Sequence, residues 1–376
     1  MNIRIMICLV VALTGFSAAA TAAPRWEIDP SQLPPGLTKE QAITMIEETD
    51  RKTEKERADE EAAERRKAEQ VRRAAKKYKE RLARAVDKDP ELRALREKLE
   101  AGMKALENPK LSEQERDERL ERMAPDMKTL RSKGLAKAGI DERAMNGEIR
   151  RALSDGVKPR GEEAGTGGEV LQEEGGAFYY ASPVKKGMPE ESSVTTRGTS
   201  TRYLRRPWPF TVIKTQIGTG GSVDRATGYY RAQASASVAG AGTNRRGLGH
   251  FLSVPSGVRE IRITALMPNT YYYNRAMTIF GGAQSKTYSV LEVWDGSTRL
   301  CRKYKLHADV WGLYAAYFTK KGDDNLNLSC RITSPRAGRT LMIKILSDAY
   351  VHAWGLGYAY DYVKALPREV RVDLIN

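Results

Sequence analysis

Three consecutive tyrosines, Tyr271, Tyr272 and Tyr273, precede Asn274 in the stretch MPNTYYYNRAMTIFGG. An aromatic ring offers a flat apolar surface, and a neighbouring amide offers a donor and an acceptor. A sugar has matching groups, because its C–H surfaces can stack on a ring while its hydroxyls hydrogen-bond to an amide. These residue types, in this order, indicate carbohydrate binding.

The alternation of side chains along a strand decides which of these residues can reach a ligand. Neighbouring side chains of a β-strand point to opposite faces. We expect Tyr271 and Tyr273 to point into a core, although Arg275 interrupts that face. Tyr272 and Asn274 then lie on the other face, which we expect to bind a glycan.

Trp294 belongs to the same aromatic-rich part of the chain and joins Tyr272 and Asn274 in the predicted ligand-binding set. A structural interpretation stays open beside this one. Tyrosine is common in strands, so Tyr272 could cover a sheet surface or contact a helical part of the chain.

Signals for catalysis, metals and cofactors are weak. The 3 histidines do not have close metal-ligand spacing, and no GxSxG, Walker A or GxGxxG motif occurs. The stretch from Asp323 resembles the start of an EF-hand loop, but Leu328 and Ser334 stand where that loop needs a glycine and a bidentate glutamate. We therefore predict no catalytic residue, no metal site and no cofactor. A carbohydrate-active enzyme, which needs two carboxylates across a cleft, stays an alternative.

The first residues of the chain predict export. Arg4 is followed by an apolar run over 5–16 and by the small residues Ala20-Thr21-Ala22, which suit a cleavage site. The run is shorter than the roughly 20 apolar residues that span a bilayer. We expect a signal peptide at 1–22, no transmembrane segment, and a periplasmic, extracellular or cell-surface location.

The cysteines agree with an oxidising compartment. Without Cys8 only Cys301 and Cys330 remain, and a pair in an exported chain predicts a disulfide. Cys330 alternates with apolar residues, whereas Cys301 shares its face with lysines. A bulge near Leu300 would reconcile the two faces; otherwise the thiols are unpaired.

The net charge of +15 indicates which classes of binding partner to expect. An exported protein rarely meets nucleic acid, so we expect none. A basic surface favours polysaccharide or an anionic envelope polymer, although the charge can also serve solubility alone.

The elements that hold these residues fall into distinct stretches. After an extended segment at 23–38, residues 39–153 are rich in helix formers. Capping boxes at Thr38 and Ser112 predict helix starts, and the charges around the long first helix predict that it is solvated. Its apolar residues follow coiled-coil spacing, which suggests a partner helix and a homo-oligomer formed through the helices; they are Val71, Ala75, Tyr78, Leu82 and Ala85.

Residues 154–200 predict a flexible linker, with a short strand at Ala177–Ala181 (AFYYA). Residues 201–376 are rich in strand formers separated by turn signals, and they predict an antiparallel β-sandwich of the jelly-roll kind. The expected strands are short; two of them cover 258–267 and 270–280.

The combined interpretation is an exported, non-catalytic binding or adhesion protein whose sandwich binds envelope or extracellular polysaccharide. A structural assembly subunit of the cell envelope or of an extracellular structure is the alternative, and a carbohydrate-active enzyme is the third.

Overall fold

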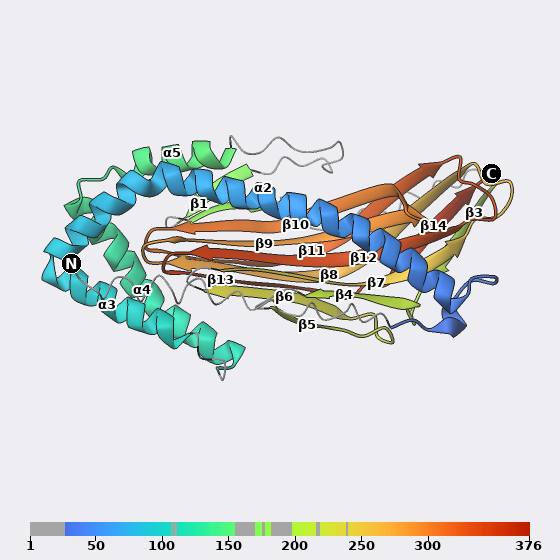
Figure 1. Cartoon of the computed structure of the whole chain (residues 1–376), viewed down its shortest axis with the longest axis horizontal. Coiled ribbons are helices and arrows are strands. Elements are labelled where there is room, and N and C mark those ends of the chain that lie inside the picture. The colour runs from blue at the N-terminus through green and yellow to red at the C-terminus, as the bar shows by residue number, and fades with distance from the viewer. Residues whose placement is uncertain are drawn as a thin grey trace, which may run out of the picture.

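The computed structural model consists of a helical N-terminal region followed by an antiparallel β-sandwich, as predicted (Figure 1). It describes residues 27–106, 108, 111–154, 170–174, 177–181, 198–215, 219–237 and 240–376. The predicted signal peptide and most of the predicted linker lie outside the described residues.

The helices begin where the sequence predicted caps. They are the short 3-10 helix η1 (Pro30–Gln32), α2 (Lys39–Lys88), α3 (Pro90–Ala105), α4 (Glu113–Lys137) and α5 (Glu142–Ser154). Thr38 and Gln41 form a complete capping box at the start of α2, and Ser112 and Glu115 form another at the start of α4. Within the described part of the chain, no helix is long and apolar enough to cross a membrane.

The strands form two antiparallel sheets. They are β1 (Val170–Glu174), β2 (Ala177–Ala181), β3 (Thr199–Leu204), β4 (Phe210–Thr215), β5 (Thr219–Val223), β6 (Tyr230–Ser237), β7 (Gly240–Ser253), β8 (Glu260–Thr278), β9 (Gly282–Asp295), β10 (Thr298–Leu313), β11 (Ala316–Thr333), β12 (Thr340–Trp354), β13 (Gly357–Ala365) and β14 (Glu369–Ile375). Sheet A has the order β1-β2-β10-β9-β12-β7-β4. Sheet B has the order β3-β14-β8-β13-β6-β5, and β11 pairs with the other side of β8.

The strands are longer than the sequence predicted. The two expected strands at 258–267 and 270–280 form one strand of 19 residues, β8. The chain passes the expected break at Asn269 in a left-handed conformation (φ 54°), and a register shift between Asp324 and Leu326 lets β11 continue its pairing with β8. A local irregularity therefore lies where a break between two strands was expected.

The predicted disulfide is present and joins the two sheets. Cys301 of β10 in sheet A bonds to Cys330 of β11 in sheet B, with 6.0 Å between the two Cα atoms. The register of β10 shifts between Arg299 and Cys301, so the bulge expected near Leu300 brings Cys301 to its partner.

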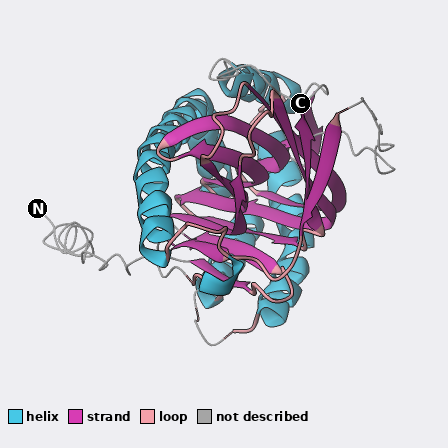
Figure 2. Ribbon diagram, turned by 90° about the vertical axis from the view of Figure 1, so that its right-hand side faces the viewer, coloured by secondary structure: helices cyan, strands magenta, loops and turns pink. Residues whose placement is uncertain are grey.

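The long helix α2 is solvated on one side only, which corrects the prediction, made from its charges, of a helix that is solvated all round. It runs across the outer face of sheet A (Figure 1), and Figure 2 shows helices outside the strand layers. Near its N-terminal end, Ala42 and Ile46 are buried in an apolar cluster with Phe210, Val290 and Trp294.

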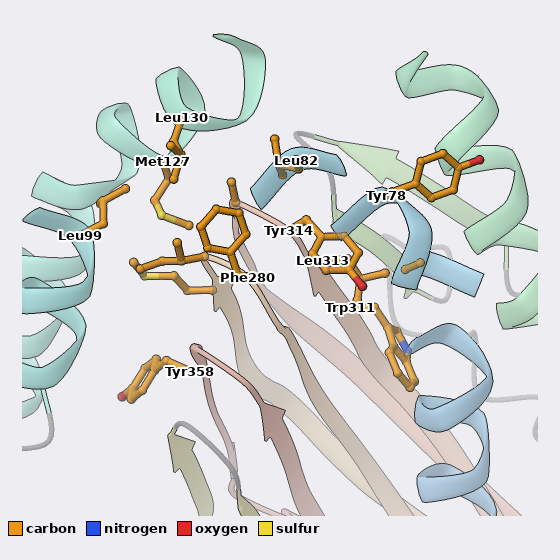
Figure 3. Packing of buried hydrophobic residues seen from close by; sticks show 14 of the residues in the cluster. Tyr78, Leu82, Leu99, Met127, Leu130, Phe280, Trp311, Leu313, Tyr314 and Tyr358 are labelled. Carbon is orange, nitrogen blue, oxygen red and sulfur yellow. The ribbon is translucent and has the colours of Figure 1, made fainter. Parts of the chain in front are cut away.

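The coiled-coil seam of α2 is occupied within the chain itself. Val71, Tyr78 and Leu82 are buried in a cluster that also holds Met145 and Ile149 of α5. Helices α3 and α4 pack at the same end of the sandwich, where Leu99, Met127 and Leu130 approach Phe280, Leu313 and Tyr314 (Figure 3).

Candidate functional site

The predicted ligand-binding residues are buried. Tyr272 and Asn274 of β8 point between the two sheets and are 2% and 0% exposed. Trp294 lies on the outer face of sheet A, beneath α2, and is 1% exposed. These placements correct the expectation that Tyr272 and Asn274 occupy a solvent-facing side of their strand.

These interior residues connect the sheets. Asn274 Nδ2 donates to Ser285 Oγ at 3.0 Å, and Thr287 Oγ1 donates to Asn274 Oδ1 at 2.8 Å, both across to β9. The ring of Tyr272 stacks on His307 with centroids 5.4 Å apart. Burial raises the pKa of Tyr272 to about 12, so its hydroxyl stays neutral.

The opposite face of β8 carries an aromatic surface. The register places Tyr273 opposite Tyr362 and Tyr271 opposite Lys364 of β13, so these side chains share a face. We call this surface the tyrosine face; it comprises Tyr271, Tyr273, Arg275, Tyr317, Tyr358, Tyr360, Tyr362 and Lys364, with Arg231 and Gln233 of β6.

Tyr362 is at the centre of the tyrosine face. Its ring stacks on Tyr273 with centroids 5.3 Å apart and on Tyr271 at 5.7 Å, while Tyr360 approaches it edge-on at 5.9 Å. Tyr271 and Tyr362 are half-buried, whereas Tyr273 and Tyr360 are buried in the apolar cluster that the sandwich shares with α3 and α4. The result is a packed platform with accessible rings on a rigid sheet.

Basic side chains lie over these rings. The Arg231 guanidinium is 4.5 Å and the Lys364 ammonium 4.9 Å from the centroid of Tyr362. Arg275 lies 5.1 Å from the centroid of Tyr273 and binds Asp117 of α4 at 2.7 Å. Cation–π contacts of this kind fix the rings and leave positive charge at the surface. The tyrosine face therefore offers flat rings, hydrogen-bond donors and cations together.

The other end of β8 is basic. A hollow of about 480 Å³ lies there, lined by Arg262, Leu300, Cys301, Arg302, Lys303, Ser329 and Arg331. The Glu260 carboxylate accepts hydrogen bonds from Arg262 and Arg331, and these bonds lower the pKa of Glu260. Basic side chains from both sheets therefore line this hollow, from β10 of sheet A and from β8 and β11 of sheet B.

A second cluster was not predicted from the sequence. His307 Nε2 is 2.9 Å from Ser289 Oγ, and His307 Nδ1 is 2.6 Å from Asp324 Oδ2. Hydrolases use the same order of contacts for nucleophilic catalysis. Ser289 is 0% exposed and also lies 2.8 Å from Ser347 Oγ, so in this conformation the cluster is an interior hydrogen-bond network closed to a substrate.

No known protein family and no curated protein matches this chain. Among solved structures, it is similar to TmCBM61 in complex with β-1,4-galactotriose, at 10% identity over 45% of this chain and 98% of that one, with a TM-score of 0.18. A structure described as "CBM4 structure and function" matches at 13% identity over 43% and 85% of the two chains, with a TM-score of 0.17.

The CBM22-2 xylan-binding domain from Paenibacillus barcinonensis Xyn10C matches at 12% identity over 41% of this chain and 91% of that one, with a TM-score of 0.14. At these TM-scores the similarities support no conclusion about function.

One signal in the sequence pointed to the tyrosine face. Arg275 lies on the same side of β8 as Tyr271 and Tyr273, and an arginine rarely enters a core without a partner. The alternation of Tyr358, Tyr360 and Tyr362 in β13 was the matching signal. Which strand pairs with β8 could not be obtained from local sequence.

Proposed function

We propose that this chain is an exported, non-catalytic binding protein that attaches to envelope or extracellular polysaccharide through the tyrosine face. The observation that carries the proposal is the stack of Tyr271, Tyr362 and Tyr273 on one sheet face, with Arg231 and Lys364 over its rings.

The chemistry of the tyrosine face suits a sugar chain. Tyr271 and Tyr362 present half-buried rings on neighbouring strands, and Gln233 stands opposite Tyr362 on β6. Rings bind the C–H surfaces of a sugar, and the amide and hydroxyls bind its oxygens. Because the platform is already packed, little side-chain entropy is lost on binding. The basic groups favour a polymer that carries some acidic sugars.

Export is the second part of the proposal. It is supported by the charged and apolar start of the chain and by the cysteine pair that bonds the two sheets. Fractionation of the native cells, followed by detection of the chain without its first 22 residues, would test this part separately from binding.

A glycan and envelope-polymer array tests the binding function. The full chain without the predicted signal peptide is compared with Tyr362→Ala and with Tyr304→Ala, a control tyrosine on β10 that is 41% exposed. We expect Tyr362→Ala to weaken binding by about tenfold or more, as for a central aromatic anchor, and Tyr304→Ala to bind as the wild type does. Binding should survive moderate salt, because stacking is not screened.

Two results would contradict the proposal that polysaccharide binds at the tyrosine face. Equal binding by all three proteins would place the ligand elsewhere. An array without any binding, together with oligomers in light scattering, would favour the assembly subunit, whose copies would meet through the helices or through strand edges.

A further inference from the structure

The middle of α2, from Thr49 to Lys67, contacts sheet A mainly through charges. The Asp50 carboxylate is 2.7 Å from the Lys344 ammonium and 3.6 Å from that of Lys214, and Glu54 is 2.9 Å from Lys214. The pairs further along the helix are Glu56 with Arg299, Glu60 with Arg302 at 2.8 Å, and Glu64 with Lys286 at 2.7 Å. One side of α2 is therefore a line of carboxylates matched to cations of the sheet.

The two ends of α2 are held differently. Ala42 and Ile46 are buried among Phe210, Phe251 and other apolar residues, and the stretch from Val71 to Val86 belongs to the large apolar cluster with α5. Apolar side chains hold a permanent contact at least as well as buried ion pairs, which lose hydration when they form. The row of ion pairs in the middle of α2 is therefore not the kind of contact that stability alone would require.

The sheet surface beneath this segment has a composition of its own. We call it the covered face. Its basic side chains are Lys214, Arg245, Lys286, Arg299, Arg302 and Lys344, its carboxylates are Glu292, Asp309 and Asp348, and its aromatic side chains are Tyr288, Trp294, Trp311 and Tyr350. The basic side chains outnumber the carboxylates, so the surface would be positive without the helix.

Cations and rings are interleaved on the covered face. The Arg299 guanidinium is 5.4 Å and the Lys344 ammonium 5.9 Å from the ring of Trp294. Sugar rings that carry carboxylates would meet both kinds of group: the aromatic ring for their C–H surface and the cation for their charge.

We propose that the covered face is a binding surface for a linear carboxylate-bearing polysaccharide, and that the acidic segment Thr49–Glu64 of α2 occupies it as an intramolecular competitor. The carboxylates of Asp50, Glu54, Glu60 and Glu64 stand where those of the polymer would lie. From Asp50 to Glu64 the helix rises about 21 Å, which gives the surface the length of an extended ligand.

Two of the ion pairs are partly open to solvent through their carboxylates. The side chains of Glu54 and Glu60 are 62% and 42% exposed while they contact the sheet. Exposed pairs are screened by salt and contribute little net free energy, so a polyanion can displace the Glu54 and Glu60 pairs before it reaches the buried pair of Asp50 with Lys344. This proposal does not depend on the tyrosine face.

Two variants with the same net charge test the proposal. The first is Glu54→Gln/Glu60→Gln/Glu64→Gln, which removes three carboxylates that face the sheet. The control is Glu47→Gln/Asp59→Asn/Glu80→Gln, which removes three exposed carboxylates of the same helix. Both are made in the full chain without the signal peptide and titrated with polygalacturonate, with dextran as the neutral polymer.

We expect the sheet-facing variant to bind polygalacturonate about three- to tenfold more tightly than the wild type, because the fraction of molecules with an open surface rises. The control should stay within about twofold of the wild type. Labelling with acetic anhydride should increase at Lys214 and Lys344 in the sheet-facing variant and decrease when polygalacturonate is added. When Tyr362→Ala is added to the sheet-facing variant, its gain in affinity for polygalacturonate should remain.

Equal gains in both variants would overturn the proposal, because net charge alone would explain them. A gain in affinity for polygalacturonate without protection of Lys344 from acetic anhydride would also overturn the proposal. So would an affinity equal to that of the wild type. If the sheet-facing variant unfolds, Glu54→Gln and its control Glu47→Gln are measured in the same way, and a gain confined to Glu54→Gln is the supporting result.

Discussion

His307 joins three strands through its two ring nitrogens, one directed at Ser289 of β9 and one at Asp324 of β11. All three groups are buried. If the imidazole were removed, the Asp324 carboxylate and the Ser289 hydroxyl would each lose a hydrogen-bond partner between the sheets. An unsatisfied buried polar group costs about 1–3 kcal/mol.

We therefore expect His307→Ala to lower the free energy of unfolding by about 2–4 kcal/mol in urea titrations. His250→Ala is the control. Among the hydrogen bonds of the described residues, the half-buried His250 ring makes one, with the backbone carbonyl of Phe251. In the same samples, a fluorophosphonate probe should leave Ser289 unlabelled in the wild type. Labelling of Ser289 would instead support a serine hydrolase, a different class from the two-carboxylate enzyme considered from the sequence.

At the scale of elements, Glu64 gives the contact between α2 and sheet A a pH dependence. The positive charges of Lys286 and Lys67 outweigh the effect of burial and lower the pKa of Glu64 from 4.5 to about 2. A carboxylate with a depressed pKa in the folded state stabilises that state above its unfolded pKa, and this contribution disappears as the pH falls through the folded value.

We expect the stability of the wild type to fall between pH 4.5 and about pH 2 by more than that of Glu64→Gln, which has no carboxylate at this position. Thermal unfolding midpoints across this range measure the difference, and Glu47→Gln is the exposed control. Parallel pH curves for wild type and Glu64→Gln would show that the Lys286 pair contributes no net stability.

The helix boundaries were predictable because they depend on local chemistry. Thr38 with Gln41 and Ser112 with Glu115 satisfy the backbone donors at the first turn, whatever the helix packs against. The environment of α2 was not predictable, because a carboxylate stripe looks the same against water as against a row of lysines. The face of β8 was wrongly predicted for a related reason. With Tyr272 between Tyr271 and Tyr273, both sides of the strand are largely apolar, and Arg275 was the one local sign of which side faces away from the sandwich interior.

At the scale of the whole molecule, the helices and the sandwich share one apolar cluster. Leu130 of α4 is 0% exposed and lies with Phe280 and Leu313 of the strand ends, as Figure 3 shows. Because neither part covers its apolar surface without the other, we expect the two to unfold together. The predicted boundary near residue 200 then separates two compositions rather than two independently stable units.

Circular dichroism can follow the two parts separately, since the helices dominate the signal at about 222 nm and the tyrosines and tryptophans of the sandwich dominate the near-ultraviolet signal. We expect coincident transitions in the wild type. Leu130→Ala leaves a cavity between helix and strands and should cost about 2–4 kcal/mol, so it should shift both transitions equally. Leu366→Ala, at a position 43% exposed, should shift neither. If Leu130→Ala moved only the helical transition, the sandwich would be stable by itself, and the shared cluster would contribute to docking rather than to folding.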